Sequence, residues 1–170
     1  MDVRVDLGNL ASLPEAFARA PGSTLGRLRQ AMHTVVANLE AGIKEATPQA
    51  HGTLSQSMFG EVQAFPNGLG VEGIVGAGQG YAPYVELGTK PHLPPIEPLV
   101  DWVRVKLGLS GKEGLRAAKA IRWAIGKRGT ESAQMFGKTL TAQQAQIDAT
   151  FDRAMADIAA YVLDPGPANG

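Results

Sequence analysis

The clearest hydrophobic pattern in the chain lies between residues 25 and 43. Ser23 or Thr24 can cap a helix here, and Thr47-Pro48 ends it, because the residue before a proline is disfavoured in helical conformation. Apolar side chains recur at steps of three and four residues, which places them on one stripe; they are Leu25, Leu28, Met32, Val35, Val36, Leu39 and Ile43. The pattern therefore predicts an amphipathic helix over roughly this whole segment.

Residues 53–76 change to short runs rich in valine, isoleucine and phenylalanine. The segments 58–65 and 69–76 are separated by Pro-Asn-Gly at 66–68, and Asn-Gly between such runs is a strong β-hairpin signal. Two antiparallel strands are expected, with Val71, Ile74 and Val75 on the apolar side.

A glycine-rich loop at 76–80 leads to a short helical turn over 81–89, which Gly88 closes at a position that needs a positive φ. The proline-rich run 91–95 must be extended. A helix then begins near Pro98 and stops at Gly108, and another covers 113–127. In the last helix, Thr141 and Gln144 suggest a capping box. The inward positions expected in these three helices are Leu99, Val100, Val103 and Leu107, then Leu115, Ala118, Ile121 and Ile125, then Leu140, Ile147, Phe151, Ile158 and Val162.

These elements predict an α+β fold. A small antiparallel, hairpin-based sheet packs against the N-terminal helix and the long C-terminal helix, and two further helices are inserted between them. Residues 1–22 are expected to form an N-terminal arm or linker, in which Val3, Val5 and Leu7 indicate either a short strand with a linker or a small helix. Residues 23–163 form the single domain, and 164–170 a disordered tail.

Composition narrows the classes of protein. The 170 residues suit one domain, and the absence of cysteine excludes disulfides and thiolate metal sites. No apolar run approaches the roughly 18 residues that a membrane span needs. The first ten residues also lack the apolar core of a signal peptide. A protein that is not in the membrane and folds in a reducing cytoplasm is expected.

The charges balance at 16 basic and 16 acidic residues but are unevenly distributed. Residues 51–103 contain one base, Lys90, against five acids, whereas 104–138 contain nine bases against two acids. Such segregation serves contact between copies or with a polyanion, or is simply a solvated mixed-charge surface. The basic residues that could face DNA or another subunit are Arg104, Lys106, Arg116, Lys119, Arg122, Lys127 and Arg128.

Patterns typical of catalytic, cofactor and metal sites are missing from the sequence. His33, His51 and His92 fall in different elements, which favours structural histidines over metal ligands. The sequence also lacks a GxSxG elbow, a phosphate-binding loop and a pair of neighbouring carboxylates. We therefore expect a protein that is not an enzyme and holds neither a cofactor nor a metal.

Residues 97–128 read as helix, glycine turn and helix, with basic residues interleaved with Trp102 and Trp123. A helix-turn-helix would look somewhat similar, but few side chains suited to reading base edges are present. The two tryptophans are expected in the core or at an interface. A small DNA-binding regulator that uses 97–128 remains an alternative, as does nonspecific proximity to genomic DNA.

Two motifs resemble a known family. Residues 47–57 match the pattern TP-x-x-x-G-x-L-x-x-S, and Tyr81-Ala82-Pro83-Tyr84-Val85-Glu86-Leu87-Gly88-Thr89 matches Y-A-x-x-V-E-x-G-T. Both are typical of the gene-ten-like tail-completion or neck proteins of long-tailed bacteriophages. The resemblance covers roughly residues 25–163.

The resemblance implies a structural virion protein at the head–tail junction of a siphophage-like particle, assembled in the bacterial cytoplasm. It would complete or join the tail as a six-fold ring that touches the tail terminator, the tail tube or head-closure proteins. A head-proximal connector or minor capsid protein is the alternative. Candidate interface residues are Tyr81, Tyr84, Glu86, Thr89, Pro91, His92 and Leu93. The competing interpretation is that Tyr81, Tyr84 and Val85 simply pack against the hairpin.

Overall fold

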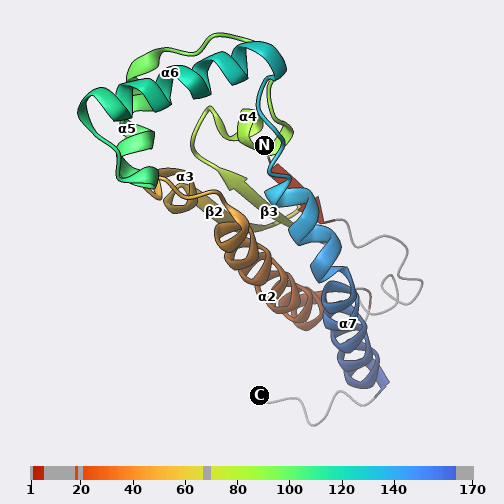
Figure 1. Cartoon of the computed structure of the whole chain (residues 1–170). Helices are drawn as coiled ribbons and strands as arrows, with labels where there is room; N and C mark the ends of the chain where they lie inside the picture. The colour runs from red at the N-terminus through yellow and green to blue at the C-terminus, as the bar shows by residue number, and fades with distance from the viewer. Residues whose placement is uncertain (1, 6–17, 19–20, 67–69, 164–170) are drawn as a thin grey trace.

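The chain combines one small sheet with long helices, as Figure 1 shows. The structure, a computed structural model, describes residues 2–5, 18, 21–66 and 70–163. Its elements are β1 (Asp2–Val5), α2 (Pro21–Ala46), α3 (Thr53–Gln56), β2 (Met58–Ala64), β3 (Val71–Ala77), α4 (Ala82–Leu87), α5 (Ile96–Leu107), α6 (Gly111–Arg128) and α7 (Met135–Leu163). The predicted α+β class, with a small antiparallel sheet and two inserted helices, is confirmed.

The sheet has three antiparallel strands in the order β1-β3-β2. The hairpin pairs Met58 with Ala77 and Ala64 with Val71, which confirms the two predicted strands. Residues 2–5 pair with 73–76 of β3, which confirms the short N-terminal strand. The predicted Asn-Gly turn and Leu7 lie outside the described residues, as does the expected tail at 164–170.

Helix α2 covers one face of the sheet at very short range. Val71, Gly73 and Val75 of β3 are buried on this face. A Cβ atom added to Gly73 would lie 2.6 Å from the Met32 sulfur, so glycine allows the helix to approach the strand closely. The prediction that Ile74 shares this face is wrong, because neighbouring residues of a strand point to opposite sides, and Ile74 is only partly buried.

Helix α7 runs antiparallel along α2, and the two lie side by side in Figure 1. The side-chain amide of Gln143 donates to the Asn38 carbonyl, and the Arg27 guanidinium lies 4.9 Å from the Tyr161 ring centre. The main core lies between these two helices and the sheet. Helix α2 is thus the direct partner of the sheet, and α7 packs mainly on α2.

Helix boundaries correct two predictions. Helix α2 begins at Pro21, before the expected caps, and Thr24 is buried inside it. Helix α7 begins at Met135, so the expected capping box does not form; the Thr141 hydroxyl instead donates to the Gly137 carbonyl within the helix. The end of α2 at Ala46, just before Thr47-Pro48, is as predicted.

Helices α5 and α6 form a hairpin that packs mainly on itself. Val103 and Ala118 are fully buried, but Leu107 and Leu115, which were expected to face inward, are exposed. Trp102 and Trp123 are 39% and 62% exposed, so the expectation of a core position is wrong for both. The contact between two short helices is too small to enclose all the apolar side chains on them. None of the helices described is both long and apolar enough to cross a membrane.

Candidate functional site

The second half of the Tyr81–Thr89 motif is anchored by the buried residue Glu86, which is 3% exposed. Its two carboxylate oxygens accept hydrogen bonds from the backbone amides of Phe136 and Gly137, at 3.0 and 3.1 Å. These amides belong to the first turn of α7, where helical amides lack partners within the helix. A carboxylate at this end is also favoured by the helix dipole. Glu86 was expected at a partner surface, and its burial shows instead that it caps α7 from α4.

Two glycines and two threonines form the base of the α5–α6 hairpin. Thr89 and Thr130 exchange backbone hydrogen bonds of 3.1 and 3.2 Å, and their hydroxyl oxygens lie 2.9 Å apart. Gly88 and Gly129, which flank this bridge, take φ angles of 72° and 76°. A Cβ atom on Gly129 would lie 1.8 Å from the Thr89 carbonyl oxygen. We call these four residues the neck; the positive φ predicted for Gly88 is confirmed.

The extended segment 90–95 runs from the neck along α6. The Arg122 side chain donates to the Pro94 carbonyl at 2.9 Å, and Leu93 lies against Gly126. The Nδ1 atom of His92 lies 3.0 Å from the Lys90 carbonyl oxygen, which can only accept, so this nitrogen carries a proton. These contacts fix the loop, while Leu93 remains 65% exposed.

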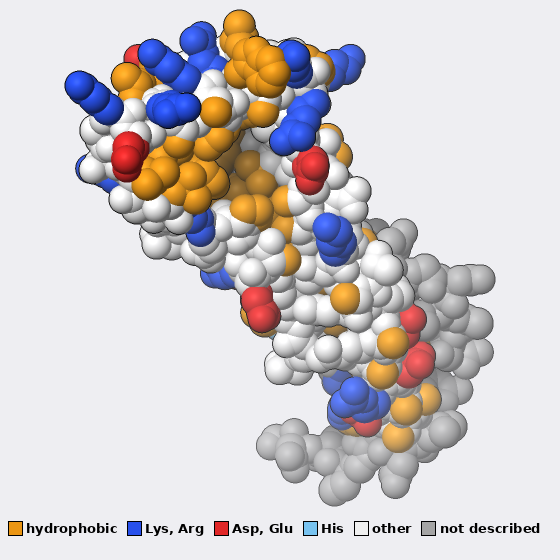
Figure 2. All heavy atoms as spheres, viewed as in Figure 1, with side chains coloured by type: hydrophobic (Ala, Val, Ile, Leu, Met, Phe, Trp, Pro, Cys, Tyr) orange, Lys and Arg blue, Asp and Glu red, His pale blue; other side chains and the backbone are white. Residues whose placement is uncertain are grey.

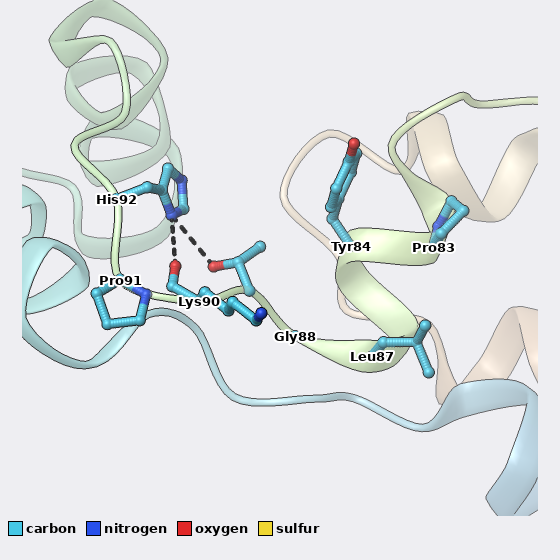
Figure 3. Close-up of a pocket in the computed structure, with 8 residues that line it drawn as sticks. Pro83, Tyr84, Leu87, Gly88, Lys90, Pro91 and His92 are labelled. Atoms are coloured by element: carbon cyan, nitrogen blue, oxygen red, sulfur yellow. Dashed lines mark hydrogen bonds between the residues drawn. The ribbon is translucent and has the colours of Figure 1, made fainter.

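An apolar hollow of about 730 Å³ opens between α4 and this loop. Tyr84, Leu87 and Pro83 of α4 line one side, and Pro91 and His92 line the other, as Figure 3 shows. Tyr84 and Leu87 are 63% and 68% exposed. In Figure 2, apolar side chains gather in a depression between the α5–α6 hairpin and the rest of the molecule. We call the hollow that Pro83, Tyr84, Leu87, Pro91 and His92 line the α4 hollow.

Tyr81 does not belong to the α4 hollow. It lines a second, smaller hollow of about 470 Å³ together with Trp102, Lys106 and residues 48–54. The expected single surface that contains both Tyr81 and Tyr84 is therefore divided by α4. The competing interpretation, in which Tyr81, Tyr84 and Val85 pack against the hairpin, fails for the two tyrosines, which are exposed. Val85 does pack partly buried against the core.

A charged contact closes one side of the second hollow. Asp101 of α5 lies 2.7 Å from the His51 Nε2 atom and also accepts a hydrogen bond from Arg104. The hydrogen bond from Arg104, and then the one from His51, lower the pKa of Asp101 below its usual value of 3.8. The contact joins the inserted hairpin to the loop after α2.

The predicted basic residues do not form one surface. Arg104 and Lys106 lie on α5, and Arg122 is held by Pro94. Arg116, Lys119 and Lys127 lie on the outer side of α6, whereas Arg128 ends that helix next to the neck. Thr89, one of the predicted interface residues, takes part in the neck bridge.

Sequence reasoning missed Leu87 and the pairing of His51 with Asp101. Leu87 carried a usable signal, because an apolar residue three positions after Tyr84 shares its side of a short helix. The pairing across fifty residues carried no local signal. Within the described residues, no three histidine, aspartate or glutamate side chains are grouped to hold a metal ion. No protein-family model matches the chain, and neither a curated protein nor a solved structure is significantly similar to it.

Proposed function

We propose that the chain is a non-catalytic subunit of a long-tailed phage particle, which binds other virion proteins at the head–tail junction and joins or completes the tail as part of a ring. The single observation that carries this proposal is the α4 hollow, in which Tyr84 and Leu87 are exposed on a helix whose opposite side is anchored by Glu86. The reason for proposing a phage particle is the resemblance of the two motifs to those of tail-completion proteins.

The α4 hollow has the properties of a protein-binding surface. Aromatic side chains are enriched at interfaces because they bury a large area with few rotatable bonds. Anchoring of α4 to α7 and closure of the neck hold Tyr84 and Leu87 in place before a partner arrives. A surface that is already ordered loses less conformational entropy on binding.

The test is electron microscopy of lysates from a phage that encodes the chain and from which its gene has been deleted. Filled heads beside separate tails are expected. Complementation with Tyr84→Ser/Leu87→Ser should fail to restore joined particles, whereas Leu115→Ser/Val105→Ser, which alters exposed apolar residues outside the α4 hollow, should restore them.

Two results would change the proposal. Unfilled heads that carry no tails would favour the alternative of a head-proximal connector or minor capsid protein. Intact, infectious particles in the absence of the gene would exclude a structural role and leave the DNA-binding regulator. Circular dichroism of the purified variants separates loss of binding from loss of folding.

A further inference from the structure

One side of α6 carries a row of four cations and one tryptophan. Lys112, Arg116, Lys119, Trp123 and Lys127 follow each other at steps of three and four residues, so they share one side of the helix. All five are exposed. The opposite side holds the buried or partly buried residues that turn toward α5, which are Gly114, Ala118, Ile121 and Ile125. We call the four cations with Trp123 the cationic stripe.

The charges of the stripe are not neutralised within the domain. Helix α6 contains six basic residues against one acid, Glu113. In the part of the chain that the structure describes, no ion pair involves Lys112, Arg116, Lys119 or Lys127. Although the whole chain has no net charge, this local excess of positive charge attracts polyanions.

Trp123 lies between Lys119 and Lys127 in the stripe and contacts the second of these. The Lys127 ammonium lies 3.8 Å from the centre of the indole ring, a cation–π contact. The ring is 62% exposed, and the contact holds the Lys127 ammonium on the exposed side of α6.

We propose that the cationic stripe binds the phosphate backbone of double-stranded DNA without reading its sequence. From Lys112 to Lys127 the helix rises about 22 Å, enough to reach several phosphates of one duplex. Helix α6 contains no asparagine, glutamine, serine or threonine, so the stripe lacks the amides and hydroxyls that discriminate base edges.

Other anionic partners fit the stripe less well. Lysine is depleted at protein–protein interfaces, yet three of the four cations are lysines. A helix that lies in a membrane surface needs a broad apolar side, whereas Ala118, Ile121 and Ile125 of α6 turn toward α5. The only large apolar residues that α6 exposes are Leu115 and Trp123. DNA binding by the stripe does not require the virion role proposed above.

The test measures fluorescence anisotropy of a labelled duplex of about 25 base pairs with the full-length chain, across roughly 25 to 200 mM salt. We expect equal affinity for two unrelated sequences. Four phosphate contacts predict a slope of log affinity against log salt of about −3.6. The variant Lys112→Gln/Arg116→Gln/Lys119→Gln should bind at least about tenfold more weakly and shift the slope by about +2.7.

A matched variant removes the same charge elsewhere. Arg29→Gln/Lys138→Gln/Arg153→Gln alters three exposed bases on α2 and α7 and should bind like the wild type. Thermal melting of both variants checks that they fold. Absence of binding at low salt, or equal binding by the two variants, would overturn the proposal. Stripe-dependent binding to phosphatidylglycerol vesicles or stripe-dependent self-association, without DNA binding, would also overturn it.

Discussion

Glu86 accepts a hydrogen bond from the backbone amide of Phe136, fifty residues further along the chain, and both residues are buried. The second carboxylate oxygen accepts from Gly137. One side chain therefore caps α7 and at the same time holds α4 in the position that exposes Tyr84 and Leu87. The stability of the domain and the presentation of the α4 hollow are coupled through this carboxylate.

Replacement of Glu86 should destabilise the domain strongly. Glu86→Ala leaves the buried amide of Phe136 and the part-buried amide of Gly137 without acceptors, and a loss of about 3 kcal/mol in the free energy of unfolding is expected. Glu86→Gln keeps one acceptor oxygen and should lose about half as much. Urea denaturation measures both. The exposed Glu45 provides the control, because Glu45→Ala should stay within about 0.5 kcal/mol of the wild type. A Glu86→Ala variant as stable as this control would contradict the capping role.

Glycine is required at position 129 of the neck. Gly129→Ala should lose at least about 2 kcal/mol of stability, because its φ of 76° is unfavourable for alanine and the new methyl group meets the Thr89 carbonyl. The matched control is Gly26→Ala in α2, where a Cβ atom meets nothing within 4 Å; it should gain up to about 1 kcal/mol. Thermal unfolding of both variants gives the comparison. Equal effects at the two positions would show that the neck relaxes freely.

The α5–α6 hairpin should open more readily than the core. Its helices pack mainly on each other and are joined to the domain at the neck and at the His51–Asp101 contact. Native-state hydrogen exchange should therefore give a lower opening free energy for α5 and α6 than for α2. Thr89→Val removes the bridge hydroxyl. It should lower the opening free energy of α5 and α6 by a further amount of about 1 kcal/mol and leave that of α2 unchanged. Uniform protection across all helices would refute this separation.

The pH dependence of the contact at Asp101 follows from its lowered pKa. NMR titration of this carboxyl in the folded protein should give a midpoint below 3.8, and Arg104→Gln should move it upward, since Arg104 is the main cause. Because the folded pKa is lowered, the contribution of the contact to stability is complete above pH 3.8 and is lost as the pH falls through the folded pKa. Arg153→Gln on α7 should leave the titration unchanged. A midpoint at or above 3.8 in the wild type would contradict the contact.

Local patterns predicted several elements correctly. The hydrophobic stripe of α2, its end before Pro48, the hairpin of β2 and β3, and the turn closed by Gly88 all depend on interactions between near neighbours. The cationic stripe of α6 was not predicted as one surface, although its spacing is also local, because residues three and four positions apart share a side of a helix wherever that helix lies.

Predictions failed where a distant residue decided the outcome. The start of α7 was misplaced because its cap, Glu86, lies fifty residues away rather than three. The tryptophans were expected in the core or at an interface; the core position is wrong because the hairpin offers too little surface to enclose them.

The sequence by itself determined that α2, α4, α5, α6 and α7 form, the hairpin, the positive φ of Gly88 and the cationic side of α6, because each is specified by residues that are close along the chain. Only the tertiary structure decided that Glu86 is buried while Tyr84 and Leu87 are exposed, that Tyr81 lies in a separate hollow, and that Asp101 meets His51. Burial depends on which segments pack together, and the contacts that set it here join residues about fifty positions apart.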